Sequence, residues 1–116
     1  MNLRINGQEL RFRVTKEELE SLCSGKTLEQ STLLPNNQVL TSTIASNSSN
    51  DGMSLSNDSN ALALLINKSL ATKFFESLPS REGLEATQEI NDELSLTLIL
   101  EVDIRTQKRK KSEEKG

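Results

Sequence analysis

The chain has 116 residues and a formal net charge of −3, and it contains no His, no Trp, no Tyr and a single Cys, Cys23. A chain of this length forms one small domain with a modest core. Without His it cannot build a Ser-His-Asp site, a Cys-His site or a His-ligated metal centre. One Cys excludes an intrachain disulfide, and the negative net charge argues against a protein that coats nucleic acid.

The N-terminal segment and the longest apolar stretch predict a cytoplasmic protein with no membrane association. Residues 1–6 alternate polar and apolar side chains, unlike the continuous apolar segment of a secretion signal. The longest apolar stretch runs from Leu62 to Ile66, far short of the roughly 20 residues that cross a bilayer.

Residues 2–14 predict a β-hairpin, because Asn6-Gly7 is a strong two-residue turn signal. A turn centred there sets Ile5 opposite Gln8 and Leu3 opposite Leu10. The hairpin then has an apolar face of Leu3, Ile5, Leu10, Phe12 and Val14 and a polar face of Asn2, Arg4, Glu9, Arg11 and Arg13. The segment Thr15-Lys16-Glu17-Glu18 has the form of a capping box and predicts a helix through about Cys23.

The rest of the chain predicts six more strands and a second helix. The first group is a strand over 28–34, a turn over 35–37, a strand over 39–45 and a short edge strand around Met53 and Leu55. A buried strand over 61–66 and a helix over about 69–78 follow. In the last hairpin, a loop over 91–93 joins strands 83–90 and 94–104 and sets Leu84 opposite Leu100.

Sliding the sequence against itself by 56 positions indicates an internal duplication. Glu20-Ser21-Leu22 falls on Glu76-Ser77-Leu78, and Leu28-Glu29 falls on Leu84-Glu85. We therefore expect a β-rich α+β fold in which two ββαββ pseudo-repeats, 1–50 and 51–104, form a single domain. The expected architecture is an eight-stranded antiparallel small barrel or curved sheet with two short helices. Residues 105–116 are expected to form a charged, disordered tail.

Several stretches resemble a family of short uncharacterised bacterial proteins from Bacteroidetes-type organisms. They are Leu3-Arg4-Ile5-x-Gly7, Leu10-Arg11-Phe12-Arg13-Val14-Thr15-Lys16, Glu18-Leu19-x-x-Leu22, Gly83-Leu84-Glu85 and Leu100-Glu101-Val102-Asp103-Ile104. The family has no known function, so the resemblance implies no activity and no site residues. The chain departs from it at Phe74, where the family has Trp, and after Glu101, where the family has Lys.

At the level of fold alone, two ββαββ halves are similar to the triphosphate tunnel proteins, the adenylate cyclase and thiamine triphosphatase-like barrels. Those are eight-stranded barrels with a charged lumen and an E-x-E-x-K strand. The strand here reads Glu9-Leu10-Arg11-Phe12-Arg13, so the metal-binding pair of carboxylates is absent. The likeness therefore concerns the fold and not the chemistry.

Two groups of charged residues are candidate sites. Arg4, Arg11 and Arg13 share one strand face and suit an anion, whereas Glu85, Glu101 and Asp103 share a face that suits a hard cation such as Mg²⁺. The alternative for both groups is a solvated surface or ion pairs between the acids and the arginines. Cys23 is expected to fill space at the end of a helix rather than to react.

The sequence favours a non-enzymatic binding or protein-interaction domain without a cofactor, and homo-oligomerisation stays open. Its partner would be an unknown protein or a small anionic ligand. The alternative is a phosphate-ligand or metal-assisted phosphohydrolase site in a charged barrel interior. A weaker alternative is a nucleic-acid accessory protein that uses the basic run Lys108-Arg109-Lys110-Lys111. An enzyme requires the arginines and acids to meet across one cavity, whereas a binding domain requires only an exposed patch.

Overall fold

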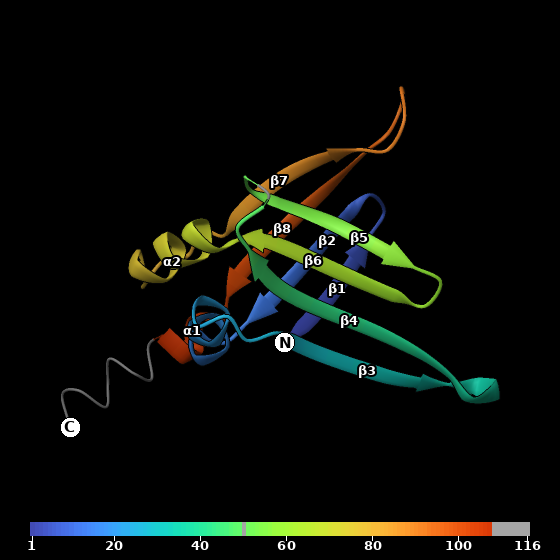
Figure 1. Ribbon diagram of the computed structural model, residues 1–116, viewed down its shortest axis with the longest axis horizontal. Helices are drawn as coiled ribbons and strands as arrows, with labels where there is room; N and C mark the ends of the chain where they lie inside the picture. The colour runs from blue at the N-terminus through green and yellow to red at the C-terminus, as the bar shows by residue number, and fades with distance from the viewer. Residues whose placement is uncertain (50, 108–116) are drawn as a thin grey trace.

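The computed structural model describes residues 1–49 and 51–107 (Figure 1). The strands are β1 (Asn2–Asn6), β2 (Glu9–Val14), β3 (Leu28–Leu34), β4 (Gln38–Asn47), β5 (Met53–Asp58), β6 (Ala61–Asn67), β7 (Leu84–Glu89) and β8 (Ser95–Val102). The helices are α1 (Lys16–Cys23), the short 3-10 helix η1 (Pro35–Asn37) and α2 (Lys68–Glu76).

The strands form two four-stranded mixed sheets, sheet A in the order β1-β2-β8-β7 and sheet B in the order β3-β4-β6-β5. The β-rich prediction is confirmed, but the expectation of purely antiparallel pairing is wrong. The central pairs β2–β8 and β4–β6 are parallel, because all four strands run from the hairpin turns toward the helices (Figure 1). The described strands do not close into a barrel.

Each sheet takes one hairpin from each half of the chain. Corresponding hairpins of the two halves pair their strands at equivalent positions. The β1–β2 pairing recurs in β5–β6, where Leu55 faces Leu64 as Leu3 faces Phe12, 52 positions earlier. The β3–β4 pairing recurs in β7–β8 at an offset of 56 positions. Neither sheet is therefore complete without both halves.

The number of positions that separates corresponding residues of the two halves is 52 in the first hairpin and the helix and 56 in the second hairpin. The helix caps Thr15 and Asn67 are 52 positions apart, and the buried Leu22 of α1 corresponds to Phe74 of α2. Matching Leu22 to Leu78, as the single offset of 56 predicts, is therefore wrong for the helices. Of the four additional residues, one lengthens α2, which has nine residues against eight in α1, and three lie in the segment 77–83, the longer counterpart of 24–27.

The core lies between the sheets and beneath the helices. It contains Leu10, Phe12, Val14, Leu19, Leu22, Ile44, Met53, Leu64, Ile66, Ala71, Phe74, Leu98, Leu100 and Val102. In β2 the buried side chains alternate with Glu9, Arg11 and Arg13, which are only partly buried. Because neighbouring residues of a strand point to opposite faces, burying the apolar set puts these charges on the outer face of sheet A.

Local signals predicted α1 and the last hairpin correctly. The Thr15 hydroxyl accepts a hydrogen bond from the Glu18 N–H at 3.1 Å, and the Glu18 carboxylate accepts one from the Thr15 N–H at 2.9 Å. Leu84 faces Leu100 as expected. In the first hairpin the expected membership of the apolar face is right, but the register is wrong.

The first turn consists of Gly7-Gln8 rather than Asn6-Gly7. Ile5 consequently faces Leu10, and Leu3 faces Phe12. Gly7 adopts a φ of +59°, which only glycine reaches readily. This register puts apolar side chains opposite one another, whereas the expected register would have left Ile5 opposite a glutamine.

A glutamine side chain joins the edges of the two sheets at β5 and β7. The Gln88 amide accepts a hydrogen bond from the Leu55 N–H at 2.7 Å and donates one to the Leu55 carbonyl at 3.1 Å. The amide thus occupies the place of a peptide group on a neighbouring strand. At the opposite edges, β1 and β3 are not paired, and the position corresponding to Gln88 is the shorter Thr32.

Replacing Gln88 by Leu should lower the free energy of unfolding by about 1–3 kcal/mol, because the Leu55 peptide loses both partners in a half-buried place. Thr32→Val, at the corresponding position of the unjoined edge, is the matched control and should be near neutral. Urea unfolding of the two variants measures the difference. Equal effects would contradict the bridging role of Gln88.

Candidate functional site

Arg11, Arg13 and Glu101 form a hydrogen-bonded group on the outer face of sheet A. The parallel β2–β8 register puts Arg13 opposite Glu101. Glu101 accepts hydrogen bonds from Arg11 Nη1 at 2.6 Å and from Arg13 Nε at 2.8 Å, and Arg11 Nη2 also donates to Glu9 at 3.2 Å. The ion pairs expected as the alternative to a metal site are therefore present at Glu101.

The environment of Glu101 favours its charged form. Partial burial raises the pKa of its carboxyl, but the hydrogen bonds from Arg11 and Arg13 outweigh that effect and lower the pKa below its usual value. The same contacts with Glu101 and Glu9 raise the pKa of Arg11. Glu101 and Arg11 are consequently both ionised at neutral pH.

Arg4 extends this group without an acidic partner of its own. It lies opposite Arg11 in the β1–β2 register and makes no ion pair with the residues that the structure describes. Asn2, Arg4, Arg11 and Arg13 line a shallow hollow of about 10 Å³, room for about one water molecule. Guanidinium groups gathered in this way suit a phosphate or a carboxylate, which they bind through paired N–H donors.

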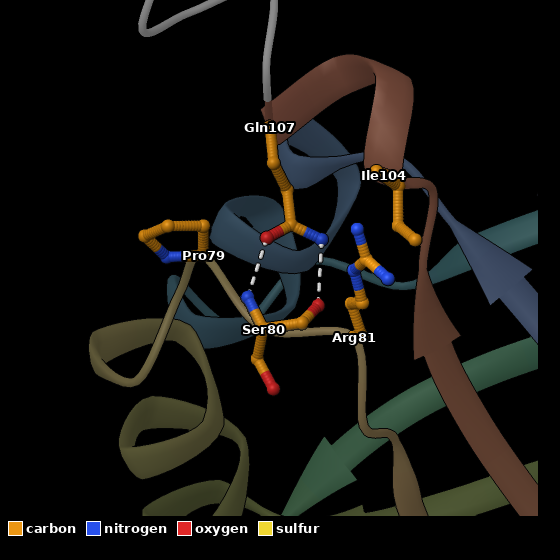
Figure 2. A pocket seen from close by; sticks show the side chains of 5 residues that line it. All are labelled: Pro79, Ser80, Arg81, Ile104 and Gln107. Carbon is orange, nitrogen blue, oxygen red and sulfur yellow. Dashed lines mark hydrogen bonds between the residues drawn. The ribbon is translucent and has the colours of Figure 1, made fainter.

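Two larger hollows continue from Arg13 across the end of sheet A. The first, of about 150 Å³, is lined by Arg13, Arg81, Glu101, Val102, Asp103 and Ile104. The second, of about 220 Å³, is lined by Pro79, Ser80, Arg81, Ile104 and Gln107 (Figure 2). The hollow beside Arg4 shares Arg13 with the first of these two, and the two share Arg81 and Ile104 with each other. We call the three adjoining hollows together the arginine furrow and define it by Arg4, Arg11, Arg13 and Arg81.

The sequence predicted Arg4, Arg11 and Arg13 but not Arg81. Arg81 lies in the 77–83 segment, where the sequence has no periodicity that would direct its side chain. Figure 2 shows this side chain extending between Ile104 and Gln107. Arg81 makes no ion pair with any described residue, so the furrow has an unpaired arginine at each end.

Gln107 holds the segment that carries Arg81. Its side chain accepts a hydrogen bond from the Ser80 N–H at 2.7 Å and donates one to the Ser80 carbonyl at 3.1 Å (Figure 2). Gln107 is buried, and residues 104–107 are helical. The expected disordered tail from residue 105 onward is therefore wrong for residues 105–107. The remainder of that tail, with its basic run, lies outside the described residues.

No charged residue is buried in the part of the chain that the structure describes. Facing side chains between the sheets are apolar, so a charged barrel lumen, the premise of the phosphohydrolase alternative, is wrong. Among residues 1–49 and 51–107, no three His, Cys, Asp or Glu side chains come close enough to hold a metal ion. Glu101 is taken up by arginines, Asp103 pairs with Arg105 at 3.4 Å, and Glu85 is exposed on β7.

Cys23 packs at the margin of the core, as expected for a space-filling residue. Burial raises the pKa of its thiol, which keeps the thiol protonated at neutral pH. In the described part of the chain, every helix is too short or too polar to cross a membrane.

A family model described as "Family of unknown function (DUF7009)" matches residues 1–116. The chain belongs to this family. No curated protein and no solved structure matches it. The expectation of an uncharacterised family is therefore confirmed, and any function of this DUF7009 protein has to be argued from its own residues.

In this DUF7009 protein, Glu101→Gln should lower the free energy of unfolding by about 1 kcal/mol at pH 7, because Arg11 and Arg13 lose the negatively charged carboxylate that both bind. The lowered pKa of Glu101 stabilises the fold above the unfolded-state value of about 4.3, and this contribution is lost as the pH falls through the folded-state pKa. The difference from the parent chain should therefore shrink toward zero as the pH falls below the folded-state pKa of Glu101.

Urea unfolding between pH 2.5 and 7 measures this dependence. Glu85→Gln, an exposed change on the same sheet, should leave the free energy of unfolding unchanged throughout. A cost for Glu101→Gln that is the same at both ends of the pH range would show that the ion pairs are not its origin.

Proposed function

We propose that the protein is a non-enzymatic binding domain that takes a small anionic ligand in the arginine furrow. The observation that carries this proposal is Arg4, which lies opposite Arg11 without an acidic partner among the described residues. Like charges directly opposite one another on neighbouring strands repel. An anion between the two guanidinium groups removes that repulsion.

The Glu101 ion pairs orient the donors that such an anion would meet. Arg13 donates to Glu101 through Nε, and no hydrogen bond to a described residue uses its terminal nitrogens. Arg13 and the unpaired Arg4 both line the hollow that Asn2 also lines. Glu101 is thus a positioning residue, and the arginines are the binding residues.

The far end of the furrow favours a phosphorylated molecule that also has an apolar part. The hollow in Figure 2 is bounded by Pro79 and Ile104, and Arg81 lies between it and the charged hollow. Ile104 is one of the large apolar residues with a high exposed fraction, 39%. An apolar group seated on Pro79 and Ile104 would leave an attached phosphate within reach of Arg81 and Arg13.

Binding without turnover agrees with the position of the acids. Glu101 is engaged by two arginines and Asp103 by a third, and the furrow lies on an open outer face. A general base needs a carboxylate or imidazole free to take a proton, and the chain has no His. Arginines and acids do line one hollow, but both acids there, Glu101 and Asp103, are already bound by arginines, which leaves neither free to act as a general base.

We also propose that the two halves arose by duplication and that only one sheet became a binding surface. The matching registers of sheets A and B support a common origin. The outer positions Ala63 and Leu65 of β6 correspond to Arg11 and Arg13 of β2 at the offset of 52. Arg81 lies in the longer segment that only the second half has.

Tripolyphosphate is a suitable probe for the furrow. The parent protein should gain several degrees in its melting temperature in millimolar tripolyphosphate, because ligand binding to the folded state stabilises it. Arg4→Gln should remove most of this gain and Arg81→Gln part of it. Differential scanning fluorimetry and titration calorimetry measure the shift and the affinity.

Lys26→Gln provides the charge-matched control, because Lys26 is exposed and distant in sequence from every furrow residue. This variant should keep the full shift, and sodium chloride of equal ionic strength should not reproduce it. No shift in the parent protein, or equal shifts in the Arg4→Gln and parent proteins, would refute the proposal. Phosphate released from tripolyphosphate in the presence of Mg²⁺ would show an enzyme instead.

A further inference from the structure

The outer part of the β3–β4 hairpin, residues 30–40, forms a projecting arm without charged residues, and we call it the arm. From Gln30 to Asn50 the sequence contains no charged residue, although 27% of the chain is charged. All residues from Glu29 to Leu40 are exposed. The arm bears Leu33, Leu34, Val39 and Leu40, with exposed fractions from 39% to 70%.

Strand β3 forms an unprotected edge of sheet B. The edges β5 and β7 are joined by Gln88 and Leu55, and the edge strand β1 carries Arg4. In the view of Figure 1, β3 runs away from β1 toward the tip of the arm. Natural proteins usually protect such edges with charges, proline or a covering segment, because unpaired N–H and C=O groups accept another strand. Within β3 only Glu29 is charged.

We infer that β3 pairs with β3 of a second copy of this chain across a two-fold axis, which makes one continuous eight-stranded sheet. A second copy fits because each chain has a net charge of −3, and the segment from Gln30 to Asn50 has no charged residue that would meet its like in the second copy. This inference is independent of the anion site, because the arm belongs to sheet B.

Full antiparallel overlap of Leu28–Leu34 with itself determines the register. Ser31 then lies opposite Ser31 of the second copy, and Glu29 lies opposite Leu33 of the second copy. The two Glu29 side chains are separated by four residues along the strands, roughly 13 Å, which exceeds the screening length at physiological salt. Leu28 meets Leu34 of the second copy on the inner face.

The register can be tested by changing the charge on the axis. Analytical ultracentrifugation of the full chain should show a dimer, of twice the 12.9 kDa chain mass, at micromolar concentration. Ser31→Glu alone and Ser31→Lys alone should each be monomeric, because like charges then face each other on the axis. An equimolar mixture of the two variants should form a heterodimer. Thr87→Glu, the exposed counterpart on the other long hairpin, should remain dimeric.

Cross-linking gives a second measurement that does not depend on disrupting the interface. In a Cys23→Ser background, Ser31→Cys should form an intermolecular disulfide under mild oxidation, whereas Thr43→Cys on the neighbouring strand should not. A monomeric parent protein at all concentrations would overturn the inference. A dimer that Ser31→Glu leaves intact, or single variants that are monomeric but do not pair when mixed, would overturn it as well.

Discussion

The structure depends on one constraint: the apolar faces of four hairpins have to be buried in a single core. Each half of the chain supplies two hairpins and one helix, and each sheet takes a hairpin from both halves. Phe12 of the first half and Leu100 of the second half face each other in the same sheet and are both fully buried. The apolar contact between the halves therefore determines the strand order.

This shared core also determines where the charges lie. With the apolar residues of β2 and β8 directed inward, the alternating residues Arg13 and Glu101 have to point outward. The parallel pairing of the two strands puts them side by side, although they are distant in sequence. The arginine furrow is thus a product of both halves, and the anion site would not exist in either half alone. The uncharged arm belongs to sheet B, so the two proposed binding surfaces lie on different sheets.

Much of the fold was predictable from local patterns, and the unpredicted parts depend on long-range contacts. The capping box at Thr15 and the register of Leu84 with Leu100 follow from residues close in sequence. Parallel pairing of β2 and β8 could not be predicted, because strand alternation looks the same for either direction. The first turn was placed one residue early because Asn-Gly is a stronger general signal than Gly-Gln, although the apolar register favours the latter.

The candidate site was predictable to a similar degree. Arg4, Arg11 and Arg13 were identified because alternation puts them on one face, but the same pattern did not show which face would be inside. Arg81 depends on Gln107 and Ser80, which meet only after folding. Gln88 resembles any polar residue on a strand, and its role becomes visible only beside the Leu55 peptide.

Separating the halves tests the shared core most directly. Residues 1–50 and 51–116 can be produced as two chains and compared by circular dichroism and amide NMR dispersion, alone and mixed. We predict that each chain alone is unfolded and that equimolar mixing restores the dispersed spectrum and a cooperative unfolding transition. A cooperatively folded half, with dispersed amide signals in the absence of the other, would contradict a core that both halves have to build.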